Sequence, residues 1–217
     1  MAKKKSTGGG IADKMAAKVS DGLMDLFESA ADERRKYYDA NPDDIPDKTA
    51  IKSIIASYAY KNAGIAAACN VVPGPWGMLA AVPELLLITR NQLRMICDIA
   101  AALGKRTQMD AHLLLAVFVA TFGGGALNLA VVKGSKVLVK RASLQVIQKI
   151  VKWLGGKITQ RVLKQLLAKW LPVVGAAAMA YWAKHSTDGI GNTAVTILSK
   201  TIERDDEPPS SEGQPVA

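Results

Sequence analysis

The chain has 217 residues, 49% of them hydrophobic and 6% aromatic, and its 28 Lys and Arg residues outnumber 19 Asp and Glu residues to give a net charge of +9. This length supports one domain with a substantial core. Two cysteines, Cys69 and Cys97, are too few for a disulfide framework, which excludes a disulfide-stapled small protein. The apolar fraction also excludes a chain that is disordered throughout.

The first third of the chain predicts a tail, a helix, a loop and a second helix. Residues 1–10 hold lysines and a glycine run, which predicts a flexible basic tail. Apolar residues recur at intervals of three and four over residues 11–40, the pattern of an amphipathic helix. A loop with two prolines follows, and either Asp47 or Thr49 is placed to cap the next helix, over about 48–72.

Two stretches of 22 uncharged residues, 62–83 and 111–132, mark the centre of the chain. As single helices each would extend roughly 33 Å, enough to cross a bilayer. Proline and glycine interrupt both, so we predict shorter helices joined by turns: apolar hairpins, within region 48–132, that pack in the core or enter a membrane partway. The residues of this hairpin motif are Pro73, Pro75, Trp76, Pro83, Gly123, Gly124 and Gly125.

A helix is also expected between the two uncharged stretches, at 85–103. Leu86, Leu93 and Ile96 belong to its apolar side. Arg90, Arg94 and Asp98 follow one another at intervals of four residues, which places them along another side.

The second half of the chain predicts basic amphipathic helices and then apolar ones. Region 133–170 holds two basic helices, at about 137–154 and 158–170, and Gly155-Gly156 is expected to separate them. Region 171–204 predicts an apolar helix to Ala183 and a last helix capped by Thr187 or Asp188.

From Asp205 onwards, residues 205–217 are rich in acidic residues and proline, which predicts a disordered acidic tail. Period-two alternation typical of strands is nearly absent from the whole chain, apart from Val137-Leu138-Val139. We therefore predict an all-α fold, a single bundle of about seven to nine helices over residues 11–204.

The positive charge is concentrated in one stretch. Residues 111–187 hold eleven basic residues and no acidic one, whereas the rest of the chain holds 17 basic and 19 acidic residues, a net charge of −2. This asymmetry indicates an anionic partner. Because the basic residues alternate with Val, Leu, Ile and Trp at helical spacing, the pattern favours a membrane surface over nucleic acid, with the solvated face of an ordinary bundle as the alternative. The predicted membrane- or anion-binding residues are Lys140, Arg141, Lys149, Lys152, Lys157, Arg161, Lys164 and Lys169.

Catalytic and metal-binding patterns are sparse. His112 and His185 are the only histidines, and neither has a second ligand at metal spacing. Gly156-Lys157-Ile158-Thr159 lacks the first glycine of a phosphate-binding loop and the Ser or Thr after its lysine. We predict a non-enzymatic protein with no catalytic residues, no metal and no cofactor.

Two groups of motifs resemble a known family. They are Asn70-Val-Val-Pro73-Gly-Pro75-Trp-Gly77, Pro83-Glu-Leu and Gln92-Leu-Arg-Met95-Ile-Cys-Asp-Ile99-Ala100 up to Gly104, then Leu171-Pro172-Val-Val-Gly175-Ala176 and Thr187-Asp-Gly-Ile190-Gly191. Over residues 54–198 the chain resembles the EcsC family and the related YcjF-like membrane families often found beside or fused to GTPases. The resemblance implies a bacterial, membrane-associated helical protein and no active-site positions. The chain departs from a typical member in its basic, acid-free second half and its Lys-rich start.

We therefore expect a non-enzymatic helical protein that associates peripherally or re-entrantly with the cytoplasmic face of an anionic membrane. The lysines at positions 3–5 are followed by Ser, Thr and Gly instead of an apolar segment, so we expect a cytoplasmic location. The alternatives are a soluble helical module whose basic face binds an acidic protein partner or the chain's own Asp-rich tail, and a lipid-binding carrier. A lipid-handling enzyme or an integral membrane protein with two hairpins is also open.

Overall fold

The computed structural model describes residues 7–68, 81–123, 129–140, 142–167 and 174–205. This part of the chain is mostly helical, as predicted, and contains six α-helices, three single-turn 3-10 helices and three short strands. In chain order they are α1 (Thr7–Ala40), η1 (Pro42–Asp44), η2 (Lys48–Ala50), α2 (Ile51–Ala68), α4 (Val82–Ala102), η3 (Arg106–Gln108), α5 (Ala111–Thr121), β1 (Ala130–Lys133), β2 (Lys136–Lys140), α6 (Leu144–Leu167), α7 (Val174–Leu198) and β3 (Thr201–Asp205).

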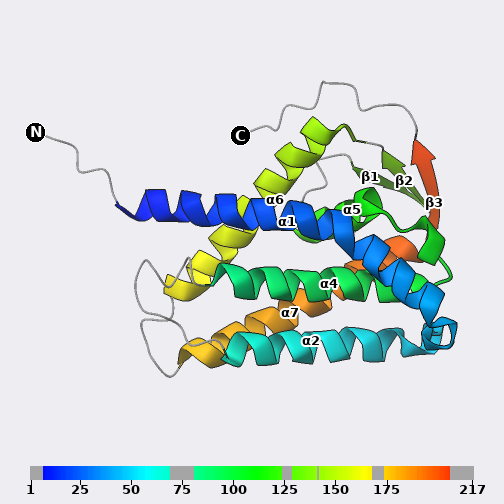
Figure 1. Cartoon of the computed structure of the whole chain (residues 1–217), viewed down its shortest axis with the longest axis horizontal. Helices are drawn as coiled ribbons and strands as arrows, with labels where there is room; N and C mark the ends of the chain where they lie inside the picture. Colours follow the sequence, from blue (N-terminus) through cyan, green and yellow to red (C-terminus); the bar gives the residue numbers. More distant parts are fainter. Residues whose placement is uncertain (1–6, 69–80, 124–128, 141, 168–173, 206–217) are drawn as a thin grey trace, which may run out of the picture.

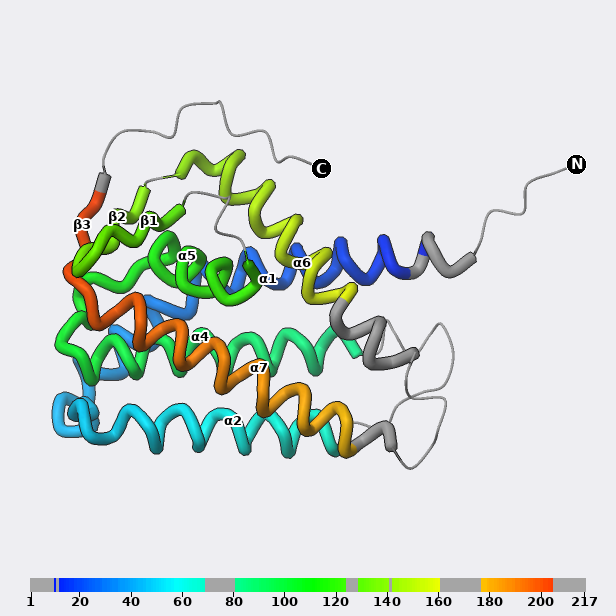
Figure 2. Tube along the Cα trace, turned by 180° about the vertical axis from the view of Figure 1, so that it is seen from behind, coloured from blue at the N-terminus to red at the C-terminus, as the bar shows by residue number. Residues whose placement is uncertain are grey.

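The helices form two layers. Helix α4 lies between α1 and α2 in one layer, and it contacts both of them (Figure 1). Seen from behind, α7 crosses α4 and α2, while α6 crosses α1 (Figure 2). The strands lie together at one end of the molecule, beside α5 (Figure 1).

Helix α4 supplies the centre of the hydrophobic core. Leu93, Met95, Ile96 and Ile99 are fully buried on it. Between α1 and α5, the rings of Phe27 and Phe118 meet edge to face with their centroids 5.6 Å apart, a favourable aromatic geometry. The main buried cluster contains residues of both helical layers, and a small second cluster of Ala66, Ile88, Met179 and Ala183 joins α2, α4 and α7.

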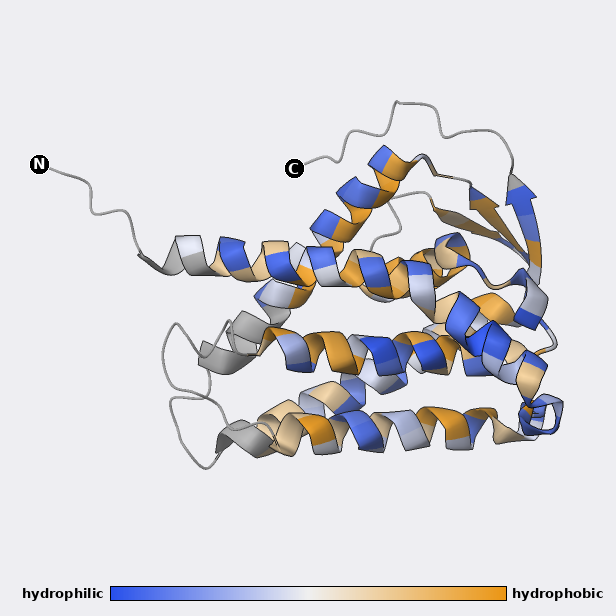
Figure 3. Ribbon diagram, in the orientation of Figure 1, coloured by the Kyte–Doolittle hydropathy of each residue, from blue (hydrophilic) through white to orange (hydrophobic). Residues whose placement is uncertain are grey.

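The small sheet corrects the prediction of an all-α fold. Strand β1 pairs antiparallel with β2, and β2 pairs parallel with β3. Region 133–140, predicted to begin the basic helices, and residues 201–204, predicted as helix, are therefore partly strand. Val137 and Val139 are buried while Leu138 between them is half-buried, so the short alternation does mark a strand. Figure 3 shows β1 and β2 as largely hydrophobic and β3 as mostly hydrophilic.

A glycine turn joins the two hairpin strands. Gly134 has φ +56° directly after β1. Two-residue hairpin loops that match the twist of the strands need positive φ, which glycine adopts without a steric penalty. The β-branched valines favour strands and Gly134 favours a turn, so this segment forms a hairpin although its lysines recur at helical spacing.

Helices α6 and α7 correct the predicted helix count, because each was predicted as two helices. Gly155 does not interrupt α6 but lies where α6 crosses α1: a Cβ atom at this position would lie 2.2 Å from Ser20 Oγ and 3.1 Å from the Ala16 carbonyl oxygen. Thr187 lies inside α7 and not at a helix start, and its hydroxyl donates to the Ala183 carbonyl over 2.7 Å. Glycine at 155 thus permits close helix packing instead of ending the helix.

Most of the predicted hairpin motif lies outside the described residues, namely Pro73, Pro75, Trp76, Gly124 and Gly125. Of the two that are described, Pro83 lies in the first turn of α4, a position that tolerates its missing N–H. Gly123 follows α5 with φ +79°. Over the described ranges, none of the helices combines the length and the apolar character needed to cross a membrane.

Candidate anion-binding surface

Helix α6 is held in the fold by its apolar side. Ile150, Val151, Leu154 and Ile158 are at most 4% exposed and belong to the core. The close crossing at Gly155 brings this side of α6 against α1. The helix is therefore a fixed structural element, and its opposite side is left to solvent.

The exposed side of α6 carries lysines and no acidic residue. Lys149, Lys152 and Lys157 are exposed, with Gln145, Gln148 and Gln160 exposed beside them. The whole of α6, Leu144–Leu167, contains no Asp or Glu. At about 100° per residue the three lysines lie within an arc of about 140°, and they span about 12 Å along the helix axis. We call these three lysines the α6 basic face.

Trp153 supports one of these lysines. Its ring packs partly against the core, and the Lys157 ammonium lies 5.7 Å from the ring centroid. This distance is within the range of a cation–π contact. The contact keeps a positive charge close to the helix surface.

The lysines of the sheet differ in availability. Lys136 forms an ion pair with Glu203 of β3 at 2.6 Å, so a carboxylate from outside the acid-free stretch already balances its charge. Lys140 is half-buried and lies opposite Asp205 in the β2–β3 register. Lys133 is exposed. The sheet therefore contributes less free positive charge than its sequence suggests.

The remaining predicted anion-binding residues are not placed with their side chains. Arg161 and Lys164 fall within the last turns of α6, but their side chains lie outside the described residues. Arg141 and Lys169 lie outside the described residues altogether. The α6 basic face thus rests on Lys149, Lys152 and Lys157.

A buried ionic cluster joins α1, α2 and α4, and sequence reasoning did not identify its members outside α4. Asp98 Oδ1 accepts hydrogen bonds from Arg34 Nε over 2.7 Å and from the Tyr38 hydroxyl over 2.8 Å. Its Oδ2 accepts one from the Tyr58 hydroxyl over 2.8 Å. Burial, and then the Asp98 charge, raise the pKa of both tyrosines, so their hydroxyls stay protonated donors.

The two arginines of α4 are also ion-paired with α1. Arg90 and Arg94 contact the Glu33 carboxylate at 2.9 and 3.0 Å. The hydrogen bond from Arg90 is the largest cause that lowers the pKa of Glu33, and burial opposes it. The predicted row of Arg90, Arg94 and Asp98 therefore faces α1, where it holds two helices together. The spacing in α4 was the available signal, but it could not reveal the partners from another helix.

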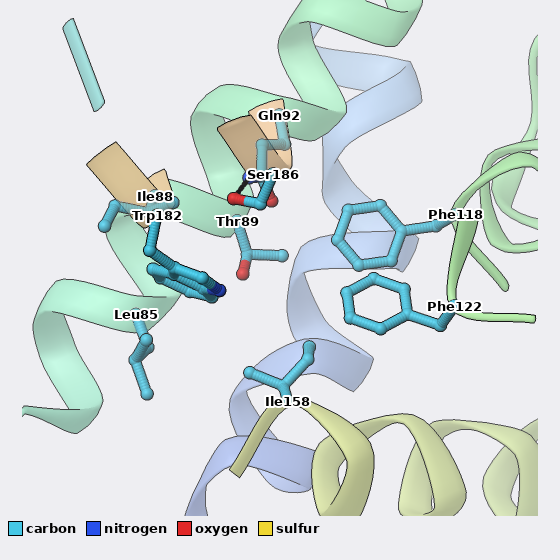
Figure 4. Close-up of a pocket in the computed structure, with 9 residues that line it drawn as sticks. All are labelled: Leu85, Ile88, Thr89, Gln92, Phe118, Phe122, Ile158, Trp182 and Ser186. Atoms are coloured by element: carbon cyan, nitrogen blue, oxygen red, sulfur yellow. Dashed lines mark hydrogen bonds between the residues drawn. The ribbon is translucent and has the colours of Figure 1, made fainter. Parts of the chain in front are cut away.

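A small cavity lies between α4, α5, α6 and α7. Figure 4 shows Trp182 on one side, the rings of Phe118 and Phe122 on the other, and Thr89 between them. Its volume of about 20 Å³ is room for one water molecule and not for an acyl chain. On its polar side, Gln92 donates to the Thr187 hydroxyl over 3.1 Å.

This contact belongs to a buried polar network between three helices. Asn62 of α2 donates to the Thr187 hydroxyl over 3.0 Å and accepts from Asn91 over 2.8 Å. All of these side chains are at most 4% exposed, so their hydrogen bonds satisfy groups that would otherwise be costly to bury. The network fixes how α2, α4 and α7 pack.

His112 contacts the backbone, His185 lies at the surface, and Cys97 is buried. His112 Nε2 lies 3.3 Å from the Ala142 carbonyl oxygen, and the ring of His185 stacks on Tyr181 with centroids 5.8 Å apart. Burial raises the pKa of the Cys97 thiol to about 12, so the thiol stays protonated at neutral pH. Within the described ranges, three or more metal-ligating side chains do not come together anywhere.

Comparison of the chain with family models, with curated proteins and with solved structures finds no match in any of the three. The resemblance to the EcsC and YcjF-like families thus stays a prediction from the sequence motifs.

Proposed function

We propose that this protein binds the cytoplasmic face of an anionic membrane peripherally, through the α6 basic face. The observation that carries the proposal is that Lys149, Lys152 and Lys157 are exposed on a helix without acidic residues. The family resemblance points in the same direction, because it implies a bacterial membrane-associated helical protein. In this proposal the helices act as one non-enzymatic domain.

The packing of α6 decides how the membrane would be bound. A free amphipathic helix buries its apolar side in the lipid, but here Val151, Leu154 and Ile158 are already buried in the protein core. Binding then depends on charge, at about 1 kcal/mol for each lysine close to an anionic surface. Salt screens such an attraction, since the Debye length is about 10 Å at 0.1 M.

Apolar contacts supplement the charges in this proposal. Val132 of β1 is an apolar side chain that is 50% exposed. The Pro- and Gly-broken segments around Pro73–Pro83 and Gly123–Gly125 add shallow or re-entrant insertion. These contacts would strengthen binding without making it independent of salt.

Co-sedimentation with lipid vesicles tests the proposal. The triple variant Lys149→Gln, Lys152→Gln, Lys157→Gln is compared with Lys48→Gln, Lys52→Gln, Lys61→Gln, which removes the same charge from exposed lysines of η2 and α2. The first variant loses most of its binding to vesicles that contain phosphatidylglycerol, and the second keeps it. Equal losses in both variants would show that only net charge matters and would refute a specific face.

An acidic protein is the second candidate partner of the α6 basic face. The Lys136–Glu203 pair at 2.6 Å is an example of a lysine of the basic stretch that binds a carboxylate. The same face would then bind carboxylates of another chain. Purified protein that ignores phosphatidylglycerol vesicles at low salt, yet binds a soluble polyglutamate, supports this candidate over the membrane.

A further inference from the structure

The parallel pairing of β2 and β3 brings two chain segments to the same edge of the sheet. Lys136 of β2 lies opposite Thr201 of β3, and Lys140 lies opposite Asp205. Parallel strands end at the same edge. The last residues of β2 and β3 therefore lie next to each other, and in Figure 1 both arrowheads point towards the end of the molecule where α6 begins.

The two segments carry opposite charge. Helix α6, which begins four residues after Lys140, has five basic residues and no acidic one. Residues 206–217, which lie outside the described part of the chain, contain Asp206, Glu207 and Glu212 and no basic residue. The acidic segment thus starts beside the strand that leads into α6, which is the most basic of the described helices.

The acidic segment is long enough to follow this helix. Twelve residues after Asp205 reach up to about 40 Å when extended. From Lys140 to the start of α6 the chain covers at most about 14 Å, and α6 rises about 20 Å from Leu144 to Lys157. Along this path Lys149 and Lys152 lie at most about 22 and 26 Å from the edge of the sheet, and Lys157 about 34 Å. Glu212, seven residues after Asp205, extends up to about 25 Å, so Lys149 and Lys152 lie within reach of its carboxylate.

We propose that residues 206–217 dock on the α6 basic face and cover it when no anionic surface is present. The tethered carboxylates then occupy the positions that lipid headgroups would take. The docking itself stands on the sheet register and the charges; the competition with a membrane rests in addition on the proposed function.

Because residues 206–217 belong to the same chain as α6, even a weak contact with the α6 basic face is enough for docking. A segment linked this closely has an effective concentration on the order of millimolar. If it covers the lysines about nine-tenths of the time, the apparent affinity of the face for any other anion falls about tenfold. Salt weakens the docked contact and the membrane contact together.

Zero-length carbodiimide cross-linking of the full chain tests the docking without any membrane. Dilute protein, mixed as equal parts of ¹⁴N- and ¹⁵N-labelled chains, reports by mass spectrometry whether each cross-link is formed within one chain. We expect same-chain cross-links from Glu212 to Lys149 or Lys152, and their loss at 1 M NaCl. Their absence at low salt, or cross-links formed only between chains, would overturn the docking.

Vesicle binding tests the competition. The variant Asp206→Asn, Glu207→Gln, Glu212→Gln is compared with Asp21→Asn, Asp25→Asn, Glu28→Gln, which changes net charge equally at exposed residues of α1. We expect the first variant to bind phosphatidylglycerol vesicles about tenfold more tightly than the unaltered chain, and the second to change affinity much less.

The two experiments separate the two claims. Same-chain cross-links without any vesicle binding keep the docking and refute the proposed function together with the competition. Vesicle binding that responds equally to both sets of neutralised acids refutes the competition and leaves the proposed function in place.

Discussion

At the scale of single residues, Asp98 connects three helices. It is the one carboxylate that accepts hydrogen bonds from Arg34, Tyr38 and Tyr58, and its side chain is 8% exposed. Removing its charge leaves the Arg34 guanidinium, itself 19% exposed, without its counter-charge. A half-buried unpaired charge is among the costlier defects that a protein can carry.

We predict that Asp98→Asn lowers the free energy of unfolding by about 3 kcal/mol. The matched control is Asp188→Asn, which breaks the partly exposed i,i+4 pair with Lys184 and costs less than about 0.5 kcal/mol. Urea denaturation followed by circular dichroism measures both. Similar small losses in the two variants would contradict the stabilising role of the Asp98 cluster.

Glu33 gives a prediction about pH. The Arg90 hydrogen bond lowers the pKa of Glu33 below its usual value of 4.5, so the ionised form stabilises the folded protein. This contribution is complete above about pH 4.5 and is lost as the pH falls through the lower pKa of the folded state. The difference in stability between the unaltered chain and Glu33→Gln should therefore be constant at neutral pH and shrink towards pH 3.

Denaturation midpoints from pH 2 to pH 7 test this prediction. Because Glu33 is 37% exposed, solvent screens the ion pairs and the difference is small. A difference that grows as the pH falls would contradict the assigned direction.

At the scale of elements, neighbouring glycines of α6 have opposite roles. A Cβ atom at Gly155 would meet Ser20 Oγ at 2.2 Å and α1 backbone atoms at 3.1 Å, whereas nothing lies within 4 Å of one at Gly156. Gly155→Ala should separate α1 from α6 and destabilise the protein by about 1–3 kcal/mol. Gly156→Ala should stabilise it by up to about 1 kcal/mol, because alanine favours helix.

Thermal unfolding of the two alanine variants measures this contrast. The pair is closely matched, since each variant adds one methyl group to the same helix. Equal stabilisation of both variants would show that α1 and α6 are not tightly packed at Gly155.

The same element shows what the sequence could predict. Helical periodicity located α1 and α4 well, because each has an apolar side. The region of α5 was predicted from its uncharged stretch and the glycines that follow it. Local chemistry also located one cap: Asp47, rather than Thr49, accepts from the backbone N–H groups of Thr49 and Ala50. Glycine in α6 misled the prediction, since close packing against another helix and helix termination use the same residue type.

The sheet shows what local sequence patterns could not predict. Its strands are four or five residues long, and β3 comes from a part of the chain more than sixty residues away from β2. Such pairing is a tertiary property that no local window contains. The ion pairs of Arg90 and Arg94 were missed for the same reason, because their partner Glu33 is on α1.

At the scale of the whole molecule, the positive residues behind the net charge of +9 are distributed unevenly between paired and exposed positions. Some of the positive charge is paired within the chain, as in the exposed Lys136–Glu203 pair, and Lys149, Lys152 and Lys157 remain exposed on α6. The location of the basic stretch was evident from the sequence, but which lysines reach solvent followed only from the packing of α6 against α1.

Vesicle binding of the unaltered chain as a function of salt tests the membrane proposal most directly. The apparent dissociation constant is measured with phosphatidylcholine vesicles and with vesicles that contain phosphatidylglycerol, between 0.02 and about 0.5 M NaCl, a range over which the Debye length falls severalfold. We predict binding to the anionic vesicles alone, and its loss as salt rises. Equal binding to both vesicle types, unchanged by salt, would contradict an electrostatic membrane-binding face on α6.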